Sequence, residues 1–448
     1  MCCHRGCFTK MNQPQFFVKN DCRKPASLTF VFINSMKKIT SIIGLMIGLV
    51  TVSVANLPLP TGWWRASITR PDGNTIDFNV AIQYKKGKTV WFIRNATEKI
   101  EVTAIEQKQD SMLVQMPLFE SEFRLQSINN NTLRGVWIKG TAAAAQVLPV
   151  VFTYNQPQRY PQAKHTKRLV TGRWNATFIE NSKKPMPAVV EFKQNGNALT
   201  GTVLTPKGDY RYLEGAVNND TLQLSTFDGS HAYYFRGTIL HDSVITDGLF
   251  FSGATSVENW TAQKNDHASI PDSVAESVAV FVKPGESRLH FRFPDLDSNL
   301  VSIDDERFKN KVVIIQIMGS WCPNCMDETA FLSDYYKTNK NKGIEMIALA
   351  YEYSTDFKRS QKSLRKFQQH FNINYPMLIT GVRVGDTLRT EKTLPEITRI
   401  KMFPTTLFIG RDGELKSTHT GFYGPGTGAH YEAYKKEFYS VMDELLKQ

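Results

Sequence analysis

Two cysteines separated by two residues follow directly after a segment that predicts a buried strand. The segment is Val312–Met318, and the cysteines lie in the run Trp321-Cys322-Pro323-Asn324-Cys325. The residues that follow predict a helix over 323–340. A Cys-x-x-Cys pair at a strand-to-helix junction is typical of thiol–disulfide chemistry. This junction therefore predicts an α/β domain built around the pair.

A short apolar run near the N-terminus follows two lysines. Lys37 and Lys38 come directly after Met36, and the uncharged run extends from Ile39 to Ala55, where it ends in small residues. This order is typical of a secretory signal peptide. The run is about 17 residues long, whereas a membrane span usually needs about 20. We expect a cleaved signal peptide over 36–55 and a periplasmic or secreted protein, with a signal-anchor as the less favoured alternative.

Residues 1–35 precede this signal and hold four of the six cysteines of the chain. The stretch is basic and shows no regular pattern. A small metal site formed by these cysteines is one interpretation. We favour the other, in which 1–35 is an upstream extension that is not part of the native protein.

Half of the net charge of the chain comes from residues 1–55. The full chain carries +12, and residues 1–55 hold seven Lys or Arg and one acid, so residues 56–448 carry +6. No Lys/Arg-rich run or nucleic-acid motif stands out in that remainder. We interpret the excess as a solvated basic surface, useful near anionic membranes or acidic partners, and expect no nucleic-acid partner.

Cys322 and Cys325 are the remaining thiols once residues 1–55 are set aside. A pair this close closes a very small loop and constrains little of the unfolded chain, so a structural staple is a poor explanation. Half of a zinc site is the alternative. However, no second Cys-x-x-Cys and no neighbouring histidine accompany the pair. We expect redox chemistry here, with no metal and no other cofactor.

The region 61–262 contains an internal repeat. The run TGWWRAS at 61–67 matches TGRWNAT at 171–177, at a spacing of 110 residues. A looser match pairs 134–140 with 246–253, and its glycines are 113 residues apart. Two matches at nearly one period predict two related units of roughly 95 residues each.

Both units have the pattern of antiparallel β structure. Apolar and polar residues alternate, as in Ile76–Ile82, and turn signals such as Asn195-Gly196 and Asp228-Gly229 recur. Evenly spaced short strands predict meander barrels or sandwiches. The Gly-x-Trp of each first strand resembles that of lipocalin and avidin barrels. The alternative is that each tryptophan closes one end of a small β core.

The pattern changes after a linker rich in Ser, Asp, Pro and Ala. We expect β repeat 1 over 56–160, β repeat 2 over 161–264, the linker over 265–287 and an α/β domain over 288–448. Its expected strands are 312–318, 344–350, 405–409 and 414–420, and its expected helices are 323–340, 356–371 and 431–447. The predicted fold is thus multidomain: two antiparallel β repeats followed by an α/β domain.

Residues 284–448 resemble the TlpA/ResA-like family of bacterial extracytoplasmic thiol–disulfide oxidoreductases. The resemblance rests on the Trp-Cys-Pro-Asn-Cys run, on Glu328, on Phe403-Pro404-Thr405-Thr406 and on Lys311-Val312-Val313. It implies a thioredoxin fold for this domain. The order of a β-rich region and then a thioredoxin domain also resembles secreted bacterial redoxin-family proteins.

The two cysteines have different expected roles. Cys322 should cap the helix, with Pro323 at its first position, where free backbone donors and the helix dipole stabilise a thiolate. Cys325 lies about one turn further on and should be more buried. We therefore expect Cys322 to attack a substrate disulfide and Cys325 to resolve the mixed disulfide.

Three further residues are expected around the cysteines. Glu328 follows Cys325 by three residues and shares its helical face, and the resemblance implies that it tunes the titration of the pair. Thioredoxins bury an acid six residues before the first cysteine, but this chain has Gln316 there, so Glu328 becomes the leading proton acceptor. Trp321 is expected to shield Cys322. The alternative for Trp321 is an aromatic core residue, and the alternative for Glu328 is an ordinary charged residue in a first helical turn.

Two loops are expected to bind substrate. In the thioredoxin fold that the resemblance implies, Pro404 is cis and packs on the disulfide, while Phe403 offers its backbone to an extended peptide. The glycine-rich stretch 420–430 is not a phosphate loop. We expect Phe422 and Tyr423 in this stretch to shape a substrate groove, with a plain flexible loop as the alternative.

The resulting hypothesis is a secreted protein-disulfide reductase. Its expected partners are disulfide-bearing exported proteins and a membrane electron donor that recharges it. A disulfide oxidase or isomerase is an alternative. A different class of function is also open, in which the β repeats bind an envelope partner and the thioredoxin domain is secondary.

Overall fold

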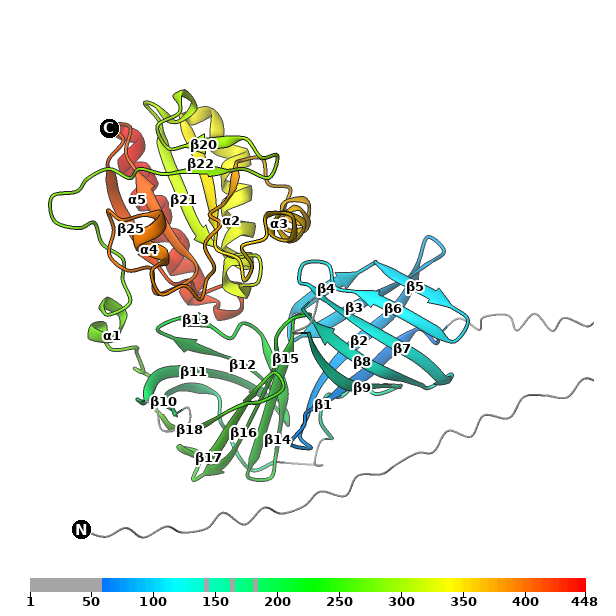
Figure 1. The fold of residues 1–448 in the computed structure, drawn as a ribbon. Coiled ribbons are helices and arrows are strands. Elements are labelled where there is room, and N and C mark those ends of the chain that lie inside the picture. Colours follow the sequence, from blue (N-terminus) through cyan, green and yellow to red (C-terminus); the bar gives the residue numbers. More distant parts are fainter. Residues whose placement is uncertain (1–58, 141–144, 162–165, 180–183) are drawn as a thin grey trace, which may run out of the picture. The chain divides into compact units, whose positions relative to one another are not determined.

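A computed structural model of the chain describes residues 59–140, 145–161, 166–179 and 184–448 (Figure 1). The expected extension over 1–35 and the signal peptide over 36–55 lie outside these described residues. The described residues belong to one compact unit. None of their helices combines the length and the apolar character that a membrane crossing requires.

The first β unit is a single antiparallel sheet in which strands adjacent in sequence pair with each other, except β4 and β5. Its order is β4-β3-β2-β1-β9-β8-β7-β6-β5, so the first and last strands, β1 and β9, also pair. The unit is barrel-like, with β4 and β5 at the two ends of the sheet. The bounds are β1 Gly62–Thr69, β2 Thr75–Lys85, β3 Lys88–Asn95, β4 Glu98–Val102, β5 Ile105–Lys108, β6 Ser111–Gln115, β7 Ser121–Asn129, β8 Thr132–Lys139 and β9 Gln146–Tyr154.

The second β unit repeats this topology and closes on itself. The order is β11-β10-β18-β17-β16-β15-β14-β12-β13, and an additional pairing of β11 with β12 completes the ring. The bounds are β10 Gly172–Ile179, β11 Met186–Asn195, β12 Ala198–Thr205, β13 Gly208–Asp209, β14 Leu213–Asn218, β15 Thr221–Phe227, β16 Ala232–Leu240, β17 Val244–Ser252 and β18 Ser256–Lys264. The expected pair of antiparallel β units is confirmed.

The repeat seen in the sequence extends to the hydrogen bonds. Indole Nε1 of Trp64 donates to the carbonyl of Pro60 at 3.1 Å, and that of Trp174 donates to Val170 at 2.9 Å, so both bonds reach four residues back. Both indoles are fully buried. Gly62 and Gly172 begin the two strands with φ of 123° and 125°, in a region that glycine enters at little cost. The two units are therefore copies of one structural element.

The two β units share apolar surface. Phe227 of β15 stacks on Phe78 of β2 with ring centroids 4.2 Å apart, inside the core of the first unit. Arg159 lies after β9 and donates to the carbonyl of Ser225 at 2.6 Å. Because both the apolar and the polar contacts are buried, the second unit completes the core of the first.

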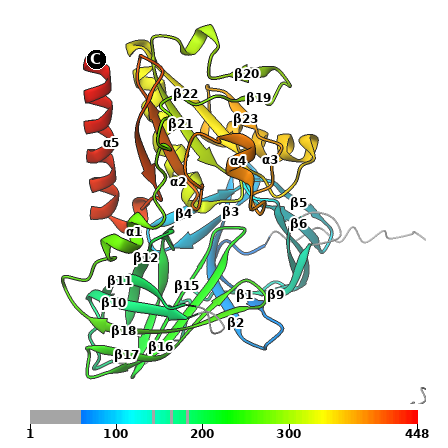
Figure 2. The same ribbon diagram turned by 60° about the vertical axis from the view of Figure 1, so that its left-hand side comes forward.

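The C-terminal domain is built on a five-stranded sheet. Figures 1 and 2 show its helices lying against this sheet. Its order is β23-β22-β21-β24-β25, with β21, β22 and β23 parallel and β24 and β25 antiparallel to their neighbours. The bounds are β21 Val312–Met318, α2 Pro323–Asn339, β22 Ile344–Ala350, α3 Phe357–Phe371, β23 Met377–Ile379, α4 Arg389–Thr393, β24 Thr405–Ile409, β25 Leu415–Thr420 and α5 Ala429–Lys447. A short α1, Asp272–Glu276, and the hairpin of β19, Arg292–Pro294, and β20, Leu300–Ser302, precede it.

Strand β21 is buried along its whole length, and its side chains alternate between two cores. Ile314 and Met318 belong to a core that also contains residues of α2, α3 and α5. Ile315 and Ile317 belong to a second core beneath the other face of the sheet, made with the 280–308 segment and the chain around α4. Since side chains on a strand alternate with period two, Gln316 faces α2, which places it behind the cysteines.

The sequence pattern located the main elements of this domain and missed the short ones. The expected strands and helices are present, with ends within two residues of those expected. Strand β23 and helix α4 were not predicted, because three and five residues are too few to show a period. Val280, inside the expected linker over 265–287, is fully buried under the sheet, since one apolar side chain leaves no pattern to detect. The domain boundaries themselves stay predictions.

Candidate active site

Cys322 and Cys325 form a disulfide at the start of helix α2. Cys322 is the N-cap residue, and Pro323 occupies the first helical position. The backbone N–H of Cys325 points at Sγ of Cys322 with an N···S distance of 3.1 Å. Both cysteines are buried, with exposed fractions of 3% for Cys322 and 0% for Cys325. When the pair is reduced, this donor and the helix N-terminus stabilise negative charge on Cys322.

The loop before β24 lies against the first cysteine. The Phe403–Pro404 peptide bond is cis, as expected. The carbonyl oxygen of Phe403 lies 3.6 Å from Sγ of Cys322. Pro404 uses its own carbonyl to accept a hydrogen bond from the N–H of Gly421 at 3.0 Å. The structure thus brings Cys322, Phe403 and Pro404 together, although they are more than 80 residues apart in sequence.

Glu328 is a fully buried carboxyl group behind the disulfide. Its Oε1 accepts hydrogen bonds from the hydroxyls of Thr406, at 2.8 Å, and Tyr434, at 3.1 Å. Its Oε2 accepts from the side-chain amide of Gln316 at 2.8 Å. Burial raises the pKa of Glu328 above its usual value, and these donors oppose the rise. A carboxyl group held this way is suited to accept and return a proton.

Gln316 connects this carboxyl group to the second cysteine. Its Nε2 lies 3.4 Å from the carbonyl oxygen of Cys325, and its Oε1 accepts from the hydroxyl of Thr329 at 2.9 Å. An amide has both donors and an acceptor, so one side chain satisfies all three neighbours. Gln316 therefore fixes the orientation of Glu328, while Glu328 is the titratable group of this buried cluster.

Trp321 lies beside the first cysteine and is half-buried. Its indole N–H donates to the carbonyl of Tyr351 at 2.8 Å, and its ring meets the rings of Phe403 at 5.5 Å and Tyr353 at 5.1 Å between centroids. Both sides of the side chain are therefore held by aromatic neighbours. The indole forms a fixed wall next to the disulfide.

A second buried carboxyl group near the cysteines was not predicted from the sequence. Glu352 follows β22 and accepts hydrogen bonds from the N–H and the hydroxyl of Ser320, both at 2.8 Å. Burial raises the pKa of Glu352 above its usual value. No sequence signal marked this residue, because its partner is 32 positions away and belongs to another loop.

The two aromatic residues expected in a substrate groove lie in different surroundings. The Phe422 side chain is 2% exposed and packs in the core against Tyr434, with centroids 4.7 Å apart. Its ring presents little exposed surface, because it is taken up by the contact with α5, yet Phe422 and Tyr423 are both among the residues that line one cavity. Tyr423 is half-buried, and its hydroxyl donates to the carbonyl of Thr205 in β12 at 3.0 Å. Tyr423 thus contacts the second β unit.

The second β unit also reaches the residues between the cysteines. Oδ2 of Asp209, in β13, accepts hydrogen bonds from the side-chain amide of Asn324 at 3.1 Å and from the N–H of Gly424 at 2.7 Å. Asn324 also donates to the carbonyl of Phe422 at 3.2 Å. Burial raises the pKa of Asp209 to about 6. A carboxyl group from the β region therefore forms part of the surroundings of the dithiol.

A buried arginine pairs with helix α2 beside this contact. Arg211 binds both carboxylate oxygens of Asp327, with Nε–Oδ2 at 2.7 Å and Nη2–Oδ1 at 2.8 Å. It also pairs with Glu98 at 2.6 Å and lies 4.0 Å from Asp228. Such a two-pronged arginine–carboxylate pair has a defined geometry. It joins α2 to strand β4 of the first β unit and to the β12–β14 segment of the second.

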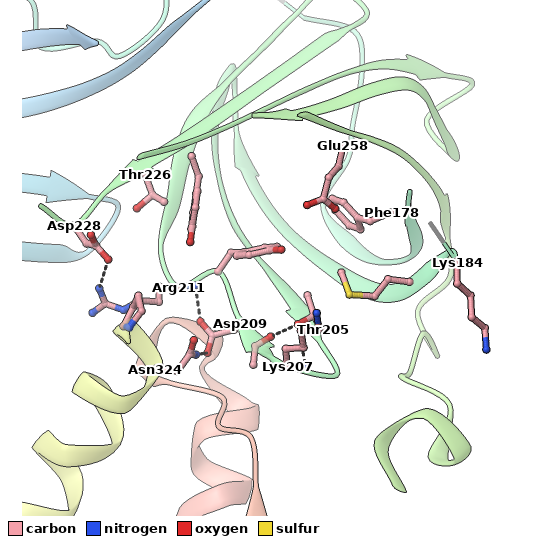
Figure 3. Close-up of a pocket in the computed structure, with 15 residues that line it drawn as sticks. Phe178, Lys184, Thr205, Lys207, Asp209, Arg211, Thr226, Asp228, Glu258 and Asn324 are labelled. Atoms are coloured by element: carbon pink, nitrogen blue, oxygen red, sulfur yellow. Dashed lines mark hydrogen bonds and ion pairs between the residues drawn. The ribbon is translucent and has the colours of Figure 1, made fainter. Parts of the chain in front are cut away.

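A cavity of about 320 Å³ lies next to these contacts (Figure 3). Its lining comes from the second β unit and from the start of helix α2. The side chains of Phe178, Met186, Tyr210 and Tyr233 contribute aromatic and apolar surface, and Pro323 and Asn324 contribute the active-site end. Among the described residues, no group of histidines, cysteines and acids could hold a metal ion.

The comparison with protein families places the redox pair inside a known domain. Residues 281–433 match the Redoxin family model. The chain is 26% identical over 131 residues to thiol-disulfide oxidoreductase ResA of Bacillus thuringiensis subsp. konkukian, a match that covers 29% of this chain and 66% of that protein. ResA of Geobacillus kaustophilus is 27% identical over 146 residues, covering 33% of this chain and 73% of that protein. The chain thus spans just under two thirds of the length of the first of these relatives.

Solved structures with a similar fold cover about a third of the chain. A thiol-disulfide oxidoreductase from Bacteroides fragilis superimposes with a TM-score of 0.26 and 18% identity, covering 34% of this chain and 99% of that chain. The thioredoxin domain of a thiol-disulfide oxidoreductase from Bacteroides vulgatus has a TM-score of 0.26 and 20% identity, covering 35% and 98%.

Proposed function

Because its C-terminal domain belongs to the TlpA/ResA-like family of thioredoxin-fold proteins, we propose that this protein is a thiol–disulfide oxidoreductase that reduces disulfides of exported proteins. The family relationship supports the reaction type. The signal sequence expected over 36–55 supports a periplasmic or secreted location, where substrates carry disulfides.

The observation that carries the proposal is the asymmetry of the cysteine pair. Cys322 caps helix α2 and receives the N–H of Cys325, whereas Cys325 is fully enclosed. The cap position and the Cys325 N–H support a more stable thiolate at Cys322, and Cys325 is the more buried of two buried cysteines, at 0% against 3% exposed. This difference separates a nucleophile from a resolving thiol.

The reaction conserves atoms and electrons as follows. The Cys322 thiolate attacks one sulfur of a substrate disulfide, and the other substrate sulfur leaves as a thiolate that takes up a proton. Cys325 then loses its proton and attacks Sγ of Cys322, which releases the second substrate thiolate. The substrate gains two electrons from the enzyme and two protons, one in balance with the proton that Cys325 loses and one from solvent, and the enzyme ends as the Cys322–Cys325 disulfide. We propose that Glu328 accepts the proton of Cys325.

The surroundings of the pair support binding of an extended peptide. The Phe403–Pro404 loop lies against Cys322, and Trp321 forms a wall next to it. Backbone groups at residue 403 can pair with a substrate strand, as in other cases of β-strand addition. A membrane dithiol donor would then return two electrons to the oxidised pair.

A trapping experiment tests the proposal. In the full chain, Cys325→Ala leaves Cys322 free to attack but removes the resolving thiol, so the mixed disulfide should accumulate. The trapped proteins should be exported and cysteine-containing, and dithiothreitol should release them. The matched control is Cys322→Ala, which should trap nothing. If Cys325→Ala traps no protein from cells that export disulfide-bonded proteins, the proposed reaction is wrong.

The direction of electron flow needs its own measurement. Equilibration with a glutathione buffer measures the reduction potential of the cysteine pair. A reductase has a low reduction potential, whereas an oxidase or isomerase has a higher reduction potential. The binding-module alternative makes a different prediction, namely that Cys322→Ala keeps all cellular function. The contact of Asp209 with Asn324 favours a joint role of the β units and the dithiol over this alternative.

A further inference from the structure

The segment Thr205–Arg211 of the second β unit lies against the residue that follows Pro323. Gly208 has φ of +121°, and a Cβ on it would sit 3.1 Å from the side chain of Asn324. Glycine therefore permits a backbone approach that a larger residue would obstruct. Figure 3 shows Asp209 and Asn324 pointing toward each other at the start of α2. The approach is thus a built contact between this β segment and the active-site turn.

Asp209 makes specific bonds in this contact. The side chain is 5% exposed. One oxygen accepts from Asn324 at 3.1 Å and from the N–H of Gly424 at 2.7 Å, and the other accepts from the N–H of Arg211 at 2.5 Å. These donors hold the carboxylate in one orientation. Oδ2 of Asp209 therefore fixes both the turn between the cysteines, through Asn324, and the loop before α5, through Gly424.

The charges that face Asp209 come from several elements. Besides burial, the negative charge of Asp327 on α2 raises the pKa of Asp209, and the positive charge of Arg211 lowers it. The charge of Asp209 in turn adds to the effect of burial and raises the pKa of the phenols of Tyr212 and Tyr423. The Arg211 guanidinium is shared with Asp327 and with two further acids, Glu98 and Asp228. Asp228 also pairs with His231, at 2.9 Å. Because Arg211 serves several acids, it does not cancel the charge of Asp209.

We propose that Asp209 is a positioning residue of the dithiol site, through which the second β unit sets the stability of the Cys322 thiolate and so the reduction potential of the Cys322–Cys325 pair. This inference rests on the proposed function. It also goes beyond that function, because it gives the β repeats a part in the redox chemistry.

The sign of the effect follows from charge. A helix N-terminus favours a thiolate at Cys322, whereas a buried carboxylate held by Asn324 opposes it. Replacing Asp209 with Asn keeps an oxygen acceptor for Asn324 and removes the negative charge. The reduced form of the pair then becomes more stable, so the reduction potential rises. The β unit in the native protein therefore keeps the pair more reducing.

The experiment compares Asp209→Asn with the wild-type full chain in glutathione redox buffers at pH 7.5. We expect the equilibrium constant for disulfide formation to fall about tenfold, which corresponds to about 30 mV for a two-electron couple. Alkylation of reduced Cys322 by iodoacetamide should become faster in the variant at a pH at which only a small fraction of the wild-type thiol is ionised. The matched control is Asp220→Asn, which removes an exposed carboxylate of the same β unit that pairs with Arg168.

A pH series separates the charge effect from a structural one. Since the pKa of Asp209 is about 6, the wild type and Asp209→Asn should differ at pH 7.5 and converge at pH 5, where the wild-type carboxyl group is protonated. A lost structural contact would leave the two proteins different at both pH values. Equal potentials at pH 7.5, or the same shift in Asp220→Asn, would overturn the proposal.

A measurement on the wild type keeps the proposal testable if the variant does not fold. Coupling between two sites is reciprocal, so reduction of the disulfide should raise the pKa of Asp209. Carbon NMR of aspartate-labelled protein measures that pKa in the oxidised and reduced states. An identical Asp209 pKa in both states contradicts the inference. None of these measurements needs a protein substrate, so a failed Cys325→Ala trap would reject the proposed function while leaving the coupling intact.

Discussion

The side-chain amide of Gln316 donates to the buried carboxyl group of Glu328 at 2.8 Å, and this pair lies directly behind the disulfide. Gln316 in β21 is neutral, so Glu328 in helix α2 is the titratable group of this cluster. If Glu328 takes the proton of Cys325, Glu328→Gln should slow resolution of the mixed disulfide about 100-fold. Rapid acid quenching after mixing reduced protein with oxidised glutathione measures this rate.

The matched control is Glu345→Gln, which removes a carboxyl group that pairs with Arg307 and Tyr336 on the same domain. Its resolution rate should equal that of the wild type. The pH profile gives a second readout. Burial raises the pKa of Glu328 above 4.5, and a base must be ionised to act, so the wild-type rate should rise with pH through that raised pKa. If the resolution rate of Glu328→Gln rises with pH as in the wild type, another group is the base.

Asp209 should also make folding stability depend on pH. Its pKa is raised from 3.8 to about 6, so the folded state binds its proton more tightly than the unfolded state. Its contribution is fully present below about pH 4 and is lost as pH rises through 6. The loss amounts to about 3 kcal/mol, from about two pKa units at 1.36 kcal/mol each.

Urea unfolding at pH 4 and pH 7 measures this contribution. The unfolding free energy at pH 4 minus that at pH 7 should be about 3 kcal/mol lower in Asp209→Asn than in the wild type. Asp220→Asn, at an exposed ion pair, should leave the difference unchanged. Equal pH dependence in all three proteins would show that Asp209 titrates normally in the folded state.

The equivalent tryptophans of the two β units should have equivalent roles. Trp64→Phe and Trp174→Phe each remove the indole N–H that reaches four residues back, and each leaves the acceptor carbonyl of Pro60 or Val170 without this donor. The expected loss is about 2 kcal/mol of unfolding free energy in each case. The neighbouring Trp63→Phe, at a half-buried position, should cost less. A large difference between the two buried positions would argue against structural equivalence.

The second repeat match concerns two glycines that leave no room for a side chain. A Cβ on Gly135 would lie 1.9 Å from the carbonyl oxygen of Arg124, and one on Gly248 would lie 2.2 Å from that of Trp260. Because backbone atoms cannot move aside, alanine at either position should cost at least about 3 kcal/mol. Gly385→Ala, with no atom within 4 Å of the added carbon, is the control and should be nearly neutral. Thermal unfolding compares the three variants.

Much of the redox domain could be predicted from short-range patterns. The seven-residue buried strand, the cysteine spacing and the helix after it lie within 30 residues of one another, so local periodicity was sufficient to place them. Pro404 and Glu328 were added by family resemblance. The repeat was visible because its two matches have nearly the same spacing, and each unit keeps the local tryptophan bond that reaches four residues back.

The contacts of Glu352 and Asp209 could not be predicted in this way. Asp209 and Asn324 are 115 positions apart, and neither lies in a pattern that points to the other. The burial of Phe422 could not be predicted for the same reason, since its core partner Tyr434 belongs to a different element. Contacts between segments this far apart depend on how the finished elements pack.

The sequence by itself determined the local features of the candidate site: two cysteines in Cys-x-x-Cys spacing at the start of a helix, a glutamate one turn later and two β repeats ahead of them. These features follow from residue type, period and spacing, which act within single elements. Only the tertiary structure decided which charges surround the dithiol. Burial and distance set a carboxyl group's effect on a thiolate, and both arise when β13 of the second β unit packs against α2.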